Sequence, residues 1–203
     1  MRDAWRMADI DSAGEAETLD ALTRRVQEAR FTLQRRANAE LIALYWLIGR
    51  SIVEREAEGD TDGAIVAQFA EDLRTEFPAM RGFCSADVHH MRTFAAEWPG
   101  RGGIFQQPVG QLPWPHVVAL LDRLDDQGLR EWYAGKAIEH TWSCDTLVEH
   151  ISARLHESDG AAPGNFAAAL SRVDSDLAHE ISNDLHTRDF LALVIDRVGA
   201  SAR

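Results

Sequence analysis

Residues between positions 81 and 92 combine side chains that could bind a phosphate backbone. Arginine donates paired hydrogen bonds to phosphate, and histidine and serine can add further contacts. Ser85 has the position of a helix N-cap before an apolar pattern, and a helix N-terminus attracts anions through its free amides and its dipole. We therefore expect DNA contacts in this stretch from Arg81, Ser85, His89, His90 and Arg92.

A second helix start lies at Ser143, the last residue of a short turn at positions 141–143. Its cap would also present free amides to a phosphate, so Ser143 is a further candidate for DNA binding. Asp145 and Glu149 follow in the first turns of this helix, and their charge would repel the nucleic-acid backbone. The stretch from 81 to 92 is therefore the stronger candidate.

The sequence offers no residue set for catalysis, a metal or a cofactor. Glu58, Asp60 and Asp62 mimic the start of a calcium-binding loop, but Phe69 stands where that loop needs a bidentate glutamate. The cysteines and the histidines near them do not reproduce the spacing of a zinc site. A glycine-rich phosphate loop and a serine nucleophile elbow are also absent from the sequence. We predict no metal, no cofactor and no catalytic residue.

Composition and charge restrict the class of protein. The net charge is −12, which argues against a protein that coats nucleic acid indiscriminately but permits a local basic face. Residues 17–58 could supply that face, because they carry seven arginines against seven acids. The longest apolar run is too short to span a bilayer, and the N-terminus lacks the apolar stretch of a signal peptide. We expect a cytoplasmic protein without membrane contact, whose Cys84 and Cys144 are reduced thiols.

The tryptophans allow a second mode of nucleic-acid binding, in which exposed aromatic rings stack on unpaired bases. Trp46, Trp132 and Trp142 lie on or beside apolar helix faces, which favours packing in the core. Trp98 and Trp114 flank a predicted loop, so they remain candidates for stacking.

One long helix is predicted near the N-terminus. Apolar residues recur every three or four positions from Leu19 to Ile52, with Ser12 or Thr18 as the cap and Gly59 at the end. A pattern of this length is typical of a coiled coil, and equally of a helix packed against its own domain. In the first case we expect a homo-oligomer whose interface contains Leu22, Val26, Leu33, Leu41, Leu44 and Ile48.

The rest of the chain predicts further helices and hence an all-α fold. Helices are expected at 65–77, after Ser85, after 112–115, at 128–140 and from Ser143 to near His156, with a loop at 100–111. The tight turn before Ser143 is compatible with helix-turn-helix geometry and equally with a plain helical hairpin. The expected organisation is a flexible N-terminus (1–16), a helical domain (17–157), a linker (158–165) and a helical tail (166–203).

Several motifs in a fixed order carry a family resemblance. Residues 38–50 read Asn-Ala-Glu-Leu-Ile-Ala-Leu-Tyr-Trp-Leu-Ile-Gly-Arg, and related motifs follow at 81–85, 91–94, 111–116 and 142–151. In these motifs the chain resembles the N-terminal domain of the YhcG-type nucleases, over most of residues 19–190. In that bacterial family a helical domain precedes a catalytic domain of the PD-(D/E)XK class. The resemblance implies an all-α domain that contacts DNA.

Two departures from the family pattern matter. Asp87, His89 and His90 stand where relatives often carry asparagine and arginine, which weakens a basic surface there. A PD-(D/E)XK site also needs an aspartate and a Glu-x-Lys pair to hold a divalent metal. Lys136 is the only lysine, and Ala134 stands two positions before it, so this chain cannot assemble that site.

These observations predict a non-catalytic DNA-binding or targeting module of a YhcG-type nuclease system. Such a module would act with a separately encoded nuclease subunit, or it would be the remnant of a split gene. The alternative is a dimeric protein-interaction scaffold that uses the long N-terminal helix and does not bind DNA.

Overall fold

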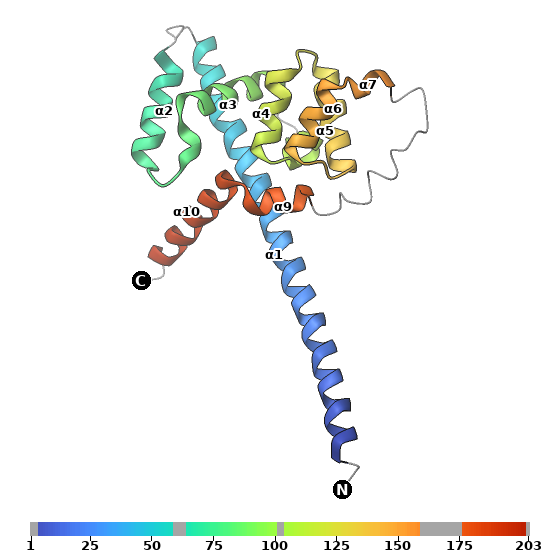
Figure 1. The fold of residues 1–203 in the computed structure, drawn as a ribbon. Helices are drawn as coiled ribbons and strands as arrows, with labels where there is room; N and C mark the ends of the chain where they lie inside the picture. Colours follow the sequence, from blue (N-terminus) through green and yellow to red (C-terminus); the bar gives the residue numbers. More distant parts are fainter. Residues whose placement is uncertain (1–3, 59–63, 101–103, 159–175, 202–203) are drawn as a thin grey trace. The chain divides into compact units, whose positions relative to one another are not determined.

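The computed structural model describes residues 4–58, 64–100, 104–158 and 176–201, and these residues form helices and turns without a β-strand (Figure 1). The predicted all-α fold is therefore confirmed. The chain divides into two compact units, an N-terminal unit of residues 1–34 and a C-terminal unit of residues 35–203.

Helix α1 (Ala4–Ala57) is the predicted long helix, and it contains no proline. It begins earlier than expected, so the predicted caps Ser12 and Thr18 lie inside the helix. A serine or threonine does not by itself stop a helix from extending past it toward the N-terminus, and the nearby Ala13, Ala16 and Ala21 favour a continuous helix. Gly59 lies outside the described residues.

The C-terminal unit contains the second part of α1 and all the later elements. These are α2 (Ala64–Glu76), η1 (Arg81–Phe83), α3 (Ser85–Glu97), η2 (Ile104–Gln106), η3 (Pro108–Gln111), α4 (Trp114–Arg123), α5 (Gln127–Glu139), α6 (Cys144–Ser152), α7 (Leu155–Ser158), α9 (Asp176–Asn183) and α10 (Leu185–Ser201). The predicted loop at 100–111 thus contains two short 3-10 turns, and the helix predicted to end near His156 is split into α6 and α7. For most of the other helices, the ends predicted from sequence periodicity lie within one or two residues of the observed ends.

The core of the C-terminal unit forms where α1 meets α3 and α4. Leu41, Ile42, Tyr45 and Ile52 of α1 are completely buried in it. The interface prediction is therefore wrong for Leu41, whose side chain packs inside its own unit because the apolar stripe of α1 has an internal partner here. Leu44 and Ile48, also predicted at an interface, are half-buried, and Ile48 packs against this core.

Tryptophans reinforce the core. Trp114 is 1% exposed, and its ring lies edge-on to Tyr45 at 4.8 Å between centroids. Trp98 is 3% exposed, and its carbonyl accepts a hydrogen bond from the indole nitrogen of Trp46 at 2.8 Å. Neither Trp98 nor Trp114 offers the open ring face that stacking on bases needs, so that interpretation was wrong for both.

The C-terminal helices pack onto the main bundle. Leu177 and Ile181 of α9 belong to the buried core, and Phe190 and Leu193 of α10 pack against it. The prediction of weaker helices near the C-terminus is confirmed for residues 176–201. Of the predicted linker at 158–165, Ser158 is the last residue of α7, and residues 159–175 lie outside the described residues. This tail therefore completes the same core as the preceding helices.

Candidate nucleic-acid interface

The N-cap of helix α3 lies one residue earlier than the sequence suggested. Cys84 has the extended backbone of an N-cap, and its sulfur accepts a hydrogen bond from the amide of Asp87 at 3.5 Å. Ser85 is already the first helical residue, so its prediction as the N-cap was wrong by one position. Its exposed side chain still lies at the helix start, where a phosphate would approach.

Arg81 lies just before this helix and is held by the C-terminal tail. Its backbone amide and its Nε both donate to Asp189 of α10 at 3.3 Å. The arginine side chain is 72% exposed, so this surface ion pair costs about 1 kcal/mol or less to open. Arg81 could exchange the carboxylate for a phosphate, but its charge is largely balanced in this arrangement.

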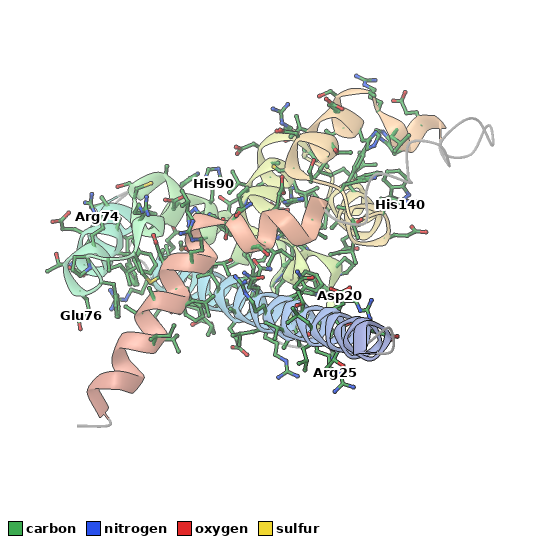
Figure 2. The ribbon with its side chains drawn as sticks, turned by 60° about the horizontal axis from the view of Figure 1, so that its bottom comes forward. Asp20, Arg25, Arg74, Glu76, His90 and His140 are labelled. Atoms are coloured by element: carbon green, nitrogen blue, oxygen red, sulfur yellow. The ribbon has the colours of Figure 1, made fainter. Side chains whose placement is uncertain are left out.

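The other basic residues predicted on α3 also have acidic partners. Arg92 donates to both carboxylate oxygens of Glu56 on α1, at distances of 2.9 to 3.1 Å. His90, labelled in Figure 2, lies 2.9 Å from Asp122 of α4 through its Nε2. His89 is exposed and lies beside the ring of His90. The structure therefore brings the five predicted residues to one region, but three of them have an acidic side chain as partner.

The start of α6 is occupied by a carboxylate. Ser143 is the N-cap, as predicted, and its hydroxyl accepts from the amide of Thr146 at 3.1 Å. Both carboxylate oxygens of Glu180 lie 3.0 Å from the amide of Cys144, the first residue of α6. Glu180 thus takes the position that a phosphate would need at this helix N-terminus, which disfavours DNA contact at Ser143.

A buried histidine lies beside the same carboxylate. His116 of α4 is completely buried, and its Nε2 donates to the carbonyl of Trp142 at 2.9 Å. Its Nδ1 has no hydrogen-bond partner and lies 3.6 Å from Glu180. Burial lowers the pKa of His116 below its ordinary value of 6.5, and this effect outweighs the hydrogen bond to the Trp142 carbonyl and the charge of Asp184, which both raise the pKa.

We expect this lowered pKa to make the fold acid-sensitive. The unfolded chain binds the His116 proton more readily than the folded one, so stability is complete above pH 6.5 and falls as the pH drops below it. Urea titrations between pH 5 and 7.5 should show a smaller acid loss for His116→Gln than for the parent chain, because glutamine keeps a donor and does not titrate. A parent chain that gains stability as the pH falls would mean that Glu180 pairs with a protonated His116.

A dense group of arginines lies elsewhere, on α1. Residues 21–36 contain five arginines and one acid, and the side chains of Arg24, Arg25, Arg30 and Arg36 are exposed. Figure 2 shows Arg25 extending away from the helix, on a different side of α1 from Asp20. The predicted DNA-binding residues lie outside this segment, although the count of charges along the sequence had already indicated a possible basic face within residues 17–58.

Other kinds of site are less developed in the part of the chain that the structure describes. No three histidine, cysteine or acidic side chains there lie close enough together to hold a metal ion. A cavity of about 350 Å³ lies between η3 and α5, lined by Trp98, Gln107, Val109 and Ala134 among others. Among the described helices, none combines the length and apolar character needed to cross a bilayer.

Comparison with known proteins places these features in a family. Residues 21–158 match the family described as the DUF1016 N-terminal domain, whereas no curated protein and no solved structure matches the chain. The matched range covers the second part of the N-terminal helix and the bundle through α7, and it includes every motif from Asn38 to Ile151 that carried the resemblance. The chain therefore belongs to the DUF1016 N-terminal domain family, the N-terminal domain of the YhcG-type proteins.

Proposed function

We propose that this chain is a non-catalytic DNA-binding or targeting module of a YhcG-type nuclease system. The family match supports the kind of system, because it covers the N-terminal domain and no nuclease domain is matched. The sequence supports the lack of catalysis, because Lys136 is the only lysine and no Glu-x-Lys pair exists in these residues. Cleavage in such a system would then come from a nuclease domain outside these residues.

The observation that carries DNA binding is the arginine-rich segment of α1. This segment of sixteen residues contains five arginines and one acid, Glu28, although the whole chain has a net charge of −12. Guanidinium groups pair with phosphate oxygens in a bidentate way, and exposed side chains can do so without breaking core contacts. The α3 face contributes less, because Arg81, His90 and Arg92 must first leave their acidic partners. Binding should therefore be local and strongly dependent on salt.

Fluorescence anisotropy with duplex and branched DNA tests this proposal. We expect binding at low salt, and log affinity should fall with log salt with a slope whose magnitude is about 0.9 for each phosphate neutralised. Combining Arg24→Gln, Arg25→Gln and Arg30→Gln should reduce that slope by roughly two to three and weaken binding at least tenfold at low salt. Binding should weaken because the triple variant loses three exposed positive charges, whereas its core contacts stay intact.

A charge-matched control keeps the result interpretable. Arg74→Gln, Arg123→Gln and Arg188→Gln remove the same charge from exposed positions on α2, α4 and α10. This control should bind DNA nearly as tightly as the parent chain. Equal losses in both triple variants would assign binding to the overall charge rather than to α1. Absence of binding by the parent chain at low salt would refute the proposal and leave the protein-interaction scaffold as the better interpretation.

A further inference from the structure

The cavity between η3 and α5 has walls of two kinds. Pro108, Val109 and Ala134 give it apolar walls, and the last two of these residues are buried. Trp98, the C-cap residue of α3, and Gln107, the residue before η3, bring polar atoms to it. Its volume of about 350 Å³ lies at the small end of the range for ligand sites, which suits a ligand of one or two fused rings.

Two buried polar atoms of these lining residues have no hydrogen-bond partner in the described part of the chain. They are Nε1 of Trp98, which can only donate, and Oε1 of Gln107, which can only accept. Unpaired buried groups of this kind destabilise a fold and are rare. Gln107 makes no side-chain hydrogen bond as the cap of η3, and it is only half-buried, so its side chain can turn toward a ligand. A ligand that accepts from the indole and donates to the amide would satisfy both atoms.

The charge of the cavity disfavours an anionic ligand. Glu131 of α5 lines it with an exposed carboxylate, and no basic side chain is among those of its lining residues that the structure describes. Glu131 would repel a phosphate or a carboxylate, whereas it would accept hydrogen bonds from an amino group. The matching ligand therefore has an acceptor beside N–H donors on one edge, and apolar faces that pack against Val109 and Ala134.

We propose that this cavity binds a nucleobase that carries an exocyclic amino group, which means adenine, guanine or cytosine. Each of these flat rings presents an acceptor next to amino hydrogens on one edge. Protein pockets read such a base by hydrogen bonds to its edge and by packing against its faces. The base comes from a free nucleoside or from an unpaired position of a DNA strand. The inference does not depend on DNA binding by the arginines of α1.

Nucleosides, which have no phosphate, test the cavity itself. In ligand-observed NMR with the full chain, we expect adenosine, guanosine or cytidine to bind with a millimolar or lower dissociation constant. Thymidine should bind at least about fivefold more weakly than the best of them, because two carbonyl oxygens flank its only base N–H and would meet Glu131 and Gln107. Failure of all three amino nucleosides to bind at millimolar concentration, or tighter binding of thymidine, would overturn the proposal.

A pair of matched variants assigns the binding to the cavity. Gln107→Leu should weaken binding of the best nucleoside at least about tenfold and should not lower the melting temperature of the free chain, because it removes an unpaired buried oxygen. Gln68→Leu makes the same change at an exposed position of α2 and should bind like the parent chain. Undiminished binding by Gln107→Leu would reject the cavity as the site.

A DNA duplex with one unpaired adenine, guanine or cytosine distinguishes the two sources of the base. Tighter binding of this duplex than of a fully paired one, with the preference lost in Gln107→Leu, would assign the cavity to an unpaired base of DNA. Equal affinity for both duplexes, in a chain that binds nucleosides, would assign it to a free nucleoside. Neutralising Arg24, Arg25 and Arg30 should weaken both duplexes and leave nucleoside binding unchanged, so this proposal and that of DNA binding by α1 fail separately.

Discussion

Replacing Gly49 with alanine is expected to destabilise the C-terminal unit by about 3 kcal/mol or more, at the upper end of the range for an over-packed core. Gly49 lies on α1 where this helix crosses α3. A Cβ atom at this position would lie 1.8 Å from the carbonyl oxygen of Met91 and 2.4 Å from its carbonyl carbon. These are backbone atoms of a regular helix, so the neighbour cannot move aside by rotating a side chain. The two helices would have to separate, and the core between them would open.

Urea unfolding followed by circular dichroism measures this effect, and Gly135→Ala is the matched control. Gly135 lies inside α5, and a Cβ atom there would meet nothing within 4 Å. Alanine is a better helix former than glycine, so the control should gain roughly 0.5 to 1 kcal/mol. The same substitution is thus expected to have opposite signs at the two positions. Wild-type stability for Gly49→Ala would show that α1 and α3 do not cross as closely as the structure indicates.

Gly49 and its neighbours explain what the family signature does in this chain. Residues 38–50 were the most informative segment of the sequence, and they suggested a functional role because they carry the resemblance. In the structure, Tyr45 is buried against Trp114, Trp46 donates to the carbonyl of Trp98, and Gly49 permits the close crossing with α3. This part of the signature therefore holds the bundle together, and the exposed charges that could touch DNA lie outside it.

Local features of the fold could be predicted from the sequence, because their causes are local. The 3.6-residue period predicted the helices, and Ser143 has the cap position that its side chain requires. Cys84 shows the limit of this reasoning: a serine next to a cysteine is the better cap by residue type, yet the backbone of Cys84 has the extended conformation. The start of α1 was missed for a related reason, since a good cap does not prevent a helix from continuing through it.

The electrostatics of the candidate site could not be predicted in this way. The partner of Arg81 is Asp189, that of Arg92 is Glu56, and that of His90 is Asp122, each on a different helix. Only packing brings these acids next to the predicted basic residues, so counting charges near Ser85 overestimated the available positive surface. Packing also determines which part of the apolar stripe on α1 is buried: its later part is buried, whereas its earlier part is exposed.

The second large effect is expected at Asn38, the first residue of the signature. Asn38 is completely buried, and its side-chain nitrogen donates to the carbonyls of Leu112 at 3.0 Å and Gln111 at 3.3 Å. Its side-chain oxygen lies 3.4 Å from the hydroxyl of Thr187 on α10. One amide therefore joins α1, the end of η3 and the C-terminal tail, at a place that water does not reach.

Changing Asn38→Asp replaces this amide by a carboxylate of nearly the same shape. The new group cannot donate to the two carbonyls, and its charge is buried beside them, so we expect a loss of about 3 to 5 kcal/mol at neutral pH. Asn38→Ala removes the hydrogen bonds without adding a charge and should cost less, about 1 to 3 kcal/mol. Chemical denaturation at pH 7 gives both values, and limited proteolysis should show earlier cleavage in the tail. A smaller loss for Asn38→Asp than for Asn38→Ala would contradict a dry, acceptor-lined environment.

The pH dependence of Asn38→Asp distinguishes the effect of a buried charge from that of the lost hydrogen bonds. Burial raises the pKa of a carboxyl, so the folded variant binds a proton more readily than the unfolded one. Relative to the parent chain, its stability should therefore rise as the pH falls from 7 toward 5, because the protonated group regains a donor. The Asn38→Ala variant has nothing to titrate at this position and should keep a constant deficit over the same range. If both deficits stay constant, the lost hydrogen bonds to Gln111 and Leu112 rather than a buried charge account for the loss.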